Sequence, residues 1–437
     1  MTLSQKTSSA TRSDAERGAL ISALLAGAWR ATPTAADLSE TELTEIAPLL
    51  CHTGSAALGW WRIRDQRSEP AAMLHEAYRR FRLSALIHEQ EIKYVFSLLR
   101  AEGIEPVLVK GWAIARLYPD QGLRPYGDID LCVRPDQFAK AERVLKCLES
   151  IDGHYVDLHS GFAKLEGAHA SLRAVRRHHC LRWDELFERS QLVSLCSPCP
   201  SGEFPAKTIH HEGTEDTEKI RVLSDEDHLR ILCLHLLRSG AWRPLWLCDV
   251  AVALETRAAD FNWDRCLGSD PKIADWIACT IGLAQRLLKA GSADVPSALS
   301  ARQELPRWLA PAILRQWGRS LNPHALEMAL PALSARTDDA RKFFKEMYAR
   351  WDQPVRATVA VRGRFNNWPR LPYQLGELLL RSSEIPKQLS EMFRGLIRNQ
   401  QRRATEARSH RERNGTGRTN ETTSEAREML RPLPFVS

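Results

Sequence analysis

The sequence predicts an α/β (α+β) core with a small mixed sheet, flanked by N-terminal helices and followed by a mostly helical C-terminal region. Residues 105–157 alternate strand, helix, strand, helix and strand, and apolar residues recur at helical spacing on both sides of them. The length of 437 residues allows two or three structural units, because domains usually have about 100 to 200 residues. We expect disorder at 1–16, helices at 17–100, the core at 101–222, a helical domain at 223–393 and a basic disordered tail at 394–437.

Two helical stretches are predicted ahead of the core. Ser39 and Thr41 stand among polar residues that open a first helix, and Gly103 ends a longer helix over 70–100. Apolar residues of the longer helix recur at approximately helical spacing, which predicts a buried face made of Leu74, Tyr78, Phe81, Ala85, Ile92, Phe96 and Leu99.

The core begins with a strand over 105–109 that runs into a turn at Lys110-Gly111. A helix over 112–117 follows this turn. Because the first N–H groups of a helix favour negative charge, we expect this strand–turn–helix to be able to hold phosphate.

A second apolar strand starts at the paired aspartates Asp128 and Asp130. Pro135 is expected at the first position of a helix that ends at Glu149, because proline is favoured there. A third strand then reaches Asp157. These elements form an α/β unit that is small enough to be a catalytic core.

Asp128 and Asp130 are the most informative residues of the core. Alternate side chains of a strand share a face, so both carboxylates point one way while Ile129 and Leu131 point into a core. Two converging carboxylates are unfavourable unless a cation lies between them. Mg²⁺ prefers oxygen ligands and usually shares them with substrate phosphates. The pair therefore predicts a metal site, and Gly127 before it lets a ligand approach the backbone.

These motifs resemble the active site of the polymerase-beta-like nucleotidyltransferase superfamily and, more narrowly, a bacterial family of uncharacterised nucleotidyltransferases. In that family Lys-Gly, here Lys110-Gly111, replaces the usual Gly-Ser turn. An arginine precedes the aspartates, here Arg124 in R-P-Y-G-D-I-D, and an acidic residue stands beside Leu-His, here Asp157 in Y-V-D-L-H. A helical segment resembling 222–253 follows, so the resemblance covers roughly residues 70–290.

The resemblance implies a nucleotidyl transfer that depends on Mg²⁺ or Mn²⁺. Asp128 and Asp130 would bind the metal ion that carries the triphosphate. Asp157 would complete the site for a second metal ion or deprotonate the acceptor directly. His159 shares the strand face of Asp157 and would orient that carboxylate or donate to the acceptor, with a purely structural hydrogen-bonding role as the alternative.

The same resemblance implies a nucleotide-binding role for three residues. Lys110 would act as a point charge on the β- or γ-phosphate, and Gly111 completes the turn that receives the phosphates. Arg124 would neutralise the polyphosphate or orient the D-I-D loop, and packing against Tyr126 is the alternative.

The expected substrate is a nucleoside triphosphate, with ATP as the first candidate. The acceptor stays open between a small molecule, a protein hydroxyl and an RNA end. Two other classes also stay open: a nucleotide-binding scaffold without activity, and a toxin-like nucleotidyltransferase that modifies a protein or transfer RNA. Retention of all three carboxylates argues against the scaffold, because they repel one another.

Other clusters have simpler interpretations. Asp225-Glu226-Asp227 is the acidic first turn of a helix with Ser224 as its N-cap. Cys196-Ser-Pro-Cys199 lacks a second C-x-x-C at zinc-ribbon spacing and is interpreted as a loop. The remaining groups are more typical of core packing than of ligand binding, although a base or sugar pocket remains an alternative for the tryptophans: His228 and His235, and Trp242 and Trp246.

The net charge of +7 comes mostly from the C-terminal tail. Between Arg394 and Arg418 there are eight arginines against two glutamates, so nucleic-acid binding is not expected of the nearly neutral remainder. No apolar run approaches about 18 residues, which excludes a membrane span. The scattered cysteines suit a reducing cytoplasm. Residues 18–29 faintly imitate a signal peptide but are only mildly apolar, so a cytoplasmic protein is expected.

Overall fold

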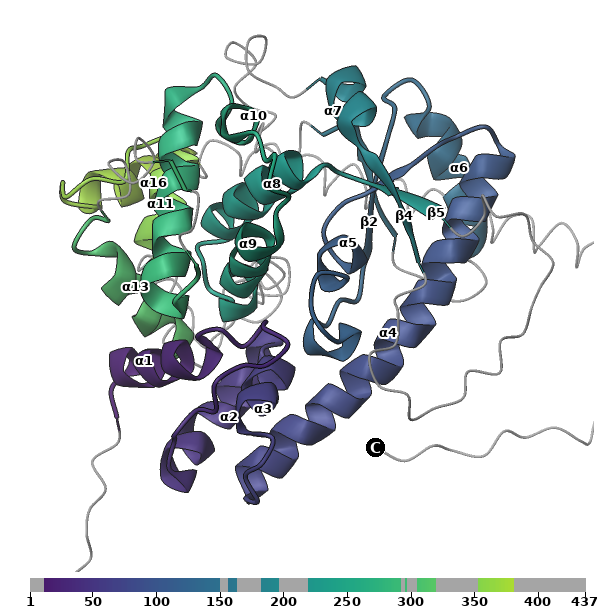
Figure 1. Ribbon diagram of the computed structural model, residues 1–437. Coiled ribbons are helices and arrows are strands. Elements are labelled where there is room, and N and C mark those ends of the chain that lie inside the picture. The colour runs from purple at the N-terminus through teal and green to yellow at the C-terminus, as the bar shows by residue number, and fades with distance from the viewer. Residues whose placement is uncertain are drawn as a thin grey trace, which may run out of the picture. The chain divides into compact units, whose positions relative to one another are not determined.

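Figure 1 shows the computed structural model of the protein. The structure describes residues 12–149, 156–162, 182–195, 219–291, 295–296, 305–319 and 353–380. The chain divides into two compact units, Met1–Glu377 and Leu378–Ser437. Some residues considered in the sequence lie outside the described ones: 1–11, the Cys196-x-x-Cys199 pair and the arginine-rich tail.

A mixed sheet of five strands forms the core of the described part, in the order β3-β2-β1-β5-β4. The strands are β1 (Val107–Leu108), β2 (Ile129–Val133), β3 (Val156–Ser160), β4 (Gln191–Ser194) and β5 (Lys219–Val222). β2 pairs parallel with β3 and antiparallel with β1, whereas β5 pairs parallel with β1 and antiparallel with β4. The predicted α/β class with a small mixed sheet is confirmed.

β4 is not predicted from the sequence, and the physical reason is its position at the edge of the sheet. Three of its four residues are exposed and only Val193 is half-buried, so its side chains need no apolar alternation. β1 is also shorter than the strand expected over 105–109.

The N-terminal helices are α1 (Asp14–Leu25), α2 (Glu40–Thr53), α3 (Ala56–Ile63) and α4 (Glu69–Ala101). Ser13 and Ser39 cap α1 and α2 through capping boxes with Glu16 and Glu42. α4 agrees within a residue with the predicted helix over 70–100. Its first half packs into a helical core, and Ile92, Phe96 and Leu99 of its second half pack against the sheet.

Two short elements differ from the sequence expectation. α5 (Trp112–Ala115) has four residues rather than six. α6 (Phe138–Glu149) begins at Phe138 and not at Pro135. The amide of Gln137 donates to the carbonyl of Arg134, so Pro135 takes the second position of a turn, where its fixed φ is equally favourable.

The described chain after β5 is mostly helical, as predicted. Helix α7 (Trp183–Arg189) precedes β4, and the helices after β5 include α8 (Asp225–Arg238), α9 (Pro244–Thr256), α10 (Trp263–Leu267), α11 (Pro271–Leu288), α13 (Leu309–Trp317) and α16 (Pro354–Ala360). Apolar faces of α8, α9 and α11 share one buried core with the first three helices. Among the described helices, none is long and apolar enough to cross a membrane.

The two faces of β2 differ in what covers them. Ile129, Leu131 and Val133 pack in one cluster with the second half of α4, as the alternation predicts. Cys132 on the opposite face joins a smaller cluster with residues of α7 and α8. Asp130 lies on the Cys132 face, because alternate residues of a strand point the same way. The helices α7 and α8 therefore border the face that carries the predicted catalytic residues.

Candidate active site

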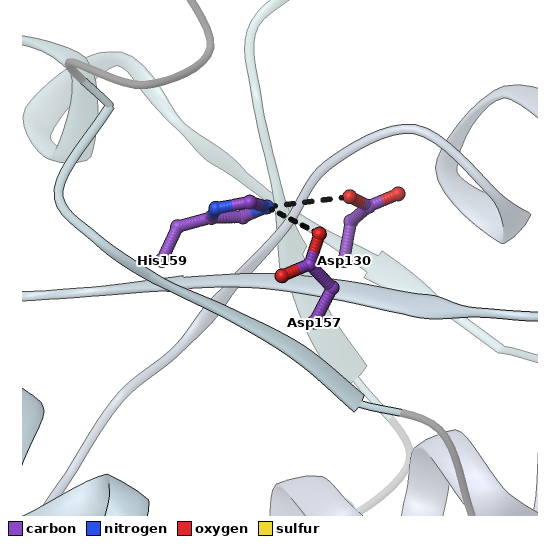
Figure 2. A group of neighbouring side chains, drawn as sticks. All are labelled: Asp130, Asp157 and His159. Atoms are coloured by element: carbon purple, nitrogen blue, oxygen red, sulfur yellow. Dashed lines mark hydrogen bonds and ion pairs between the residues drawn. The ribbon is translucent and has the colours of Figure 1, made fainter. Parts of the chain in front are cut away.

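The register of β2 and β3 places Asp130 directly opposite Asp157. Cys132 is opposite His159 one pleat further along. Because paired residues of neighbouring strands point to the same face, the side chains of Asp130, Asp157 and His159 meet on one side of the sheet (Figure 2). Residues that are 27 positions apart in the sequence thus become neighbours.

Hydrogen bonds and ion pairs join the cluster. Nε2 of His159 lies 3.3 Å from Oδ1 of Asp130 and 3.3 Å from Oδ2 of Asp157. Nζ of Lys110 lies 2.6 Å from the same Oδ1 of Asp130. Lys110 follows β1, which pairs with β2, and the amide of Val109 donates to the carbonyl of Asp130. Three adjacent strands therefore supply one polar cluster.

The contacts within the cluster favour the charged form of each member. Burial of Asp130 opposes its charge, but the hydrogen bond from His159 and the nearby Lys110 together hold the pKa of Asp130 below its usual value. The hydrogen bond from His159 also lowers the pKa of Asp157. Burial opposes a charge on His159, but both carboxylates raise the pKa of His159 above its usual value. Each group thus stabilises the charged form of its neighbours.

His159 holds the two carboxylates through one nitrogen. Its Nδ1 is buried and has no hydrogen-bond partner among the described residues. Nε2 must carry the proton that the carboxylates accept, and a protonated nitrogen is not a metal ligand. With this proton, His159 contacts both carboxylates as a hydrogen-bond donor, which favours the orienting role over that of a ligand.

The cluster contains a set of atoms that suits a divalent ion. Asp130, Asp157 and His159 each offer one ligand atom, and these atoms all lie within 4.8 Å of one another. The two carboxylate oxygens suit Mg²⁺ or Mn²⁺. The Lys110 ammonium shows that the site already holds a cation against Asp130.

Asp128 lies just before β2 and outside the group of converging ligand atoms. Its side chain is half-buried, and burial together with the charge of Asp130 raises the pKa of Asp128. A cation that binds beside such a carboxylate stabilises its charged form.

The Lys110-Gly111 turn has a constrained backbone. Lys110 has φ 57° and Gly111 has φ 45°, and a Cβ at Gly111 would lie 3.4 Å from the carbonyl oxygen of Asp128. The positive φ favours glycine at position 111, and a Cβ there would touch the aspartate loop at ordinary contact distance. The amides of Ala113 and Ile114 donate to the carbonyls of Lys110 and Gly111. With α5 so short, Lys110 rather than the helix supplies most of the positive charge at this turn.

Arg124 forms a buried ion pair that the sequence analysis missed. Its Nε and Nη2 donate to Oδ1 and Oδ2 of Asp249 at 3.2 and 2.8 Å, and Tyr118 donates to Oδ1 at 2.9 Å. Although burial opposes the charge of Arg124, Asp249 raises the pKa of Arg124. This pairing favours the loop-orienting role over contact with the polyphosphate. A lone acid in the apolar run L-W-L-C-D-V-A-V-A is the signal that points to Asp249.

α4 supports the same loop from the other side. Oε1 of Glu89 accepts hydrogen bonds from Nε1 of Trp112 at 2.9 Å and from Nε2 of Gln121 at 2.5 Å. The rings of His88 and Tyr126 lie 5.3 Å apart. The turn after β1 and the loop before β2 are therefore fixed by α4 as well as by α9.

Breaking the Arg124–Asp249 pair should destabilise the protein strongly. Arg124→Met leaves a buried carboxylate without its cation, and we expect a loss of about 3 to 5 kcal/mol in the free energy of unfolding, measured with urea. The double variant Arg124→Met with Asp249→Leu should recover much of that loss. Arg134→Ala is the control, because its pair with Asp184 is exposed and should contribute less than about 1 kcal/mol. Equal losses for Arg124→Met and Arg134→Ala would contradict a stabilising role for the buried pair.

A small mixed sheet with carboxylates on neighbouring parallel strands, beside a lysine turn, has the features of a nucleotidyltransferase core. A family model described as Uncharacterised nucleotidyltransferase matches residues 41–289, which is more than half of the chain. The chain belongs to this family, and its kind of function is nucleotidyl transfer. Comparison with curated proteins and with solved structures gives no match.

Proposed function

We propose that this protein is a metal-dependent nucleotidyltransferase that moves a nucleoside monophosphate from a nucleoside triphosphate, with ATP as the first candidate, to an acceptor hydroxyl. The observation that carries the proposal is the meeting of Asp130 and Asp157 across β2 and β3, with Lys110 on Asp130. The family membership supports the transfer, and the oxygen-rich cluster supports Mg²⁺ or Mn²⁺ as the ion.

The residues of the cluster fit a bound divalent ion. Asp128 and Asp130 would hold the ion that accompanies the triphosphate, and Asp157 would complete the site on the acceptor side. When bound, such an ion neutralises phosphate charge and favours the ionised form of the acceptor oxygen. The raised pKa of Asp128 and the cation already held by Asp130 both indicate a site that favours added positive charge.

Each side chain then has a stated role. Lys110 neutralises Asp130 in the free protein and is placed to shift its ammonium to a phosphate oxygen of the bound triphosphate. Gly111 keeps the turn open for the phosphates. Arg124 keeps the aspartate loop in position through Asp249. His159 orients the two carboxylates that it joins.

Asp157 faces the acceptor in this proposal. Its side chain is 45% exposed, against 4% for Asp130, so a substrate can reach it. Its lowered pKa keeps it ionised and able to accept a proton at neutral pH. The acceptor oxygen gives its proton to Asp157 and bonds to the α-phosphorus, while the bond to the bridging oxygen breaks and pyrophosphate leaves.

The test is to follow the α-phosphate. The purified protein is incubated with each α-labelled nucleoside triphosphate, with Mg²⁺, Mn²⁺ or a chelator, together with separate protein, RNA and small-molecule fractions of a cell extract. We expect metal-dependent pyrophosphate release and transfer of the label to one fraction. If all four nucleotides stay intact with both metals and all fractions, and calorimetry detects no nucleotide binding, the proposal is wrong.

A further inference from the structure

Arg243 lies in the turn between α8 and α9 and is surrounded by aromatic rings. Its guanidinium carbon is 5.6 Å from the ring centre of Trp242 and 5.3 Å from that of Trp246. The two indoles meet edge to face at 5.6 Å. Nε of Arg243 donates to the carbonyl of Thr53 at 3.0 Å. The guanidinium is thus held in place by two rings and one hydrogen bond.

The charge of Arg243 is not balanced by a carboxylate. Within the ranges that the structure describes, it has no ion pair, and Nη1 and Nη2 make no hydrogen bond. Arg124 and Arg189, by contrast, each bind a buried aspartate through two nitrogens. Burial, reinforced by the charge of Arg124, lowers the pKa of Arg243 to about 10. A half-buried guanidinium with free N–H groups is a receptor for an anion.

Arg243 lies beside the loop that carries the paired aspartates. A Cβ added at Gly54 would meet both Nη2 of Arg243, at 2.5 Å, and Cγ of Pro125, at 3.5 Å. Pro125 belongs to the R-P-Y-G-D-I-D loop, and α9, which starts directly after Arg243, binds the same loop through Asp249. Asp128 also contributes to the electrostatic environment of Arg243. The guanidinium therefore has a fixed position relative to the active site.

The backbone of the α8–α9 turn is also fixed. Gly240 and Ala241 both have positive φ, 73° and 56°, and such a conformation is unfavourable for alanine. The buried Nε1 of Trp317 donates to the carbonyl of Ala241 at 2.9 Å. The turn thus presents Arg243 in one conformation, which lowers the entropy lost when a ligand binds.

We propose that Arg243, on its platform of Trp242 and Trp246, is an anion subsite that receives the phosphate tail of the nucleoside triphosphate. This inference rests on the proposed function and adds a residue outside the predicted motifs. The carboxylates of the cluster repel a triphosphate, and Lys110 has to leave Asp130 before it can bind a phosphate. A cation without its own carboxylate is what a polyanion beside this cluster requires.

The test measures binding of tripolyphosphate by calorimetry in the presence of a chelator, which isolates the cationic residues from any metal ion. Arg243→Gln should weaken the affinity about tenfold or more, because a charge-assisted hydrogen bond is lost. The affinity of Arg243→Lys should lie between those of the wild type and Arg243→Gln, because lysine keeps the positive charge but cannot donate two parallel hydrogen bonds as a guanidinium does. Arg257→Gln is the matched control: Arg257 also lies over an indole, at 5.4 Å from Trp263, at the other end of α9, and its replacement should leave the affinity unchanged.

Unchanged tripolyphosphate affinity in a folded Arg243→Gln protein overturns the subsite and leaves Arg243 as a bridge between α2 and α9. Unchanged tripolyphosphate affinity together with a raised KM for the acceptor would also overturn the subsite, and would show that Arg243 binds an anionic group of the acceptor instead. If Arg243→Gln does not fold, wild-type affinity in Arg243→Lys overturns it instead. Arg243-dependent tripolyphosphate binding without any nucleotide turnover would contradict the proposed function and not the subsite.

Discussion

Replacement of Asp130 by asparagine is expected to abolish metal-dependent nucleotide binding. Asp130 is the most buried carboxylate of the cluster, at 3% exposure, and it contacts both Lys110 and His159. Asparagine keeps the shape but removes the negative charge that a divalent ion requires. Calorimetry with ATP and Mg²⁺ should show a loss of at least about a hundredfold in affinity. Asp128→Asn should act in the same direction, because Asp128 lies two residues before Asp130 and feels its charge.

Asp225→Asn is the control for this experiment. Asp225 belongs to a second D-x-D sequence, but that sequence forms the first turn of α8. The Asp225→Asn protein should therefore bind ATP with the wild-type affinity. The Asp130→Asn protein should remain folded with a modest loss of stability, because Lys110 and His159 lose an ionised partner. If repulsion between the carboxylates were the only effect, the substitution would increase the stability of the protein. Equal nucleotide affinity in wild type and Asp130→Asn would exclude the metal site.

Asp157→Asn should separate binding from chemistry. Asp157 is more exposed than Asp130 and faces the acceptor in the proposed mechanism. The variant should bind ATP and Mg²⁺ within about threefold of wild type and yet lose transfer by about 10² to 10⁴, because proton transfer from the acceptor occurs only on the way to the transition state. The measurement is single-turnover transfer of an α-labelled phosphate, beside calorimetry of the same preparation.

Lys110→Ala gives the complementary pattern and serves as the comparison for Asp157→Asn. Loss of the ammonium should weaken triphosphate binding more than it slows the transfer step, since Lys110 acts on the phosphate tail in both states. Near wild-type transfer by Asp157→Asn would remove Asp157 from the chemistry. Loss of nucleotide binding in Asp157→Asn would instead make it a ligand equivalent to Asp130.

Much of the site follows from local sequence. The alternation in D-I-D-L predicts that the aspartates and the apolar residues point to opposite faces. The structure shows this for Asp130, which faces away from the cluster of Ile129 and Leu131 with α4, whereas Asp128 precedes β2. Gly111 is needed for a positive φ next to Asp128. These features depend only on strand periodicity and on the conformational freedom of glycine, so they can be predicted without knowledge of the fold.

Other features required long-range contacts. Arg124 has no local signal for its partner, which is 125 residues away on α9. The orienting role of His159 depends on a register in which Asp130 lies opposite Asp157. β4 escaped prediction because an exposed edge strand has no buried face to impose a pattern.

Periodicity acts within a few residues, so the class of fold and the pair Asp128 and Asp130 could be predicted from the sequence, while the family resemblance added Asp157 and the role of the turn at Lys110-Gly111. Tertiary structure alone decided that Lys110 pairs with Asp130, that Arg124 is held by Asp249, and that Arg243 lies beside the aspartate loop. The physical reason is that a side chain's direction is set by its own strand or helix. Its partner is set by the packing of elements that are distant in sequence.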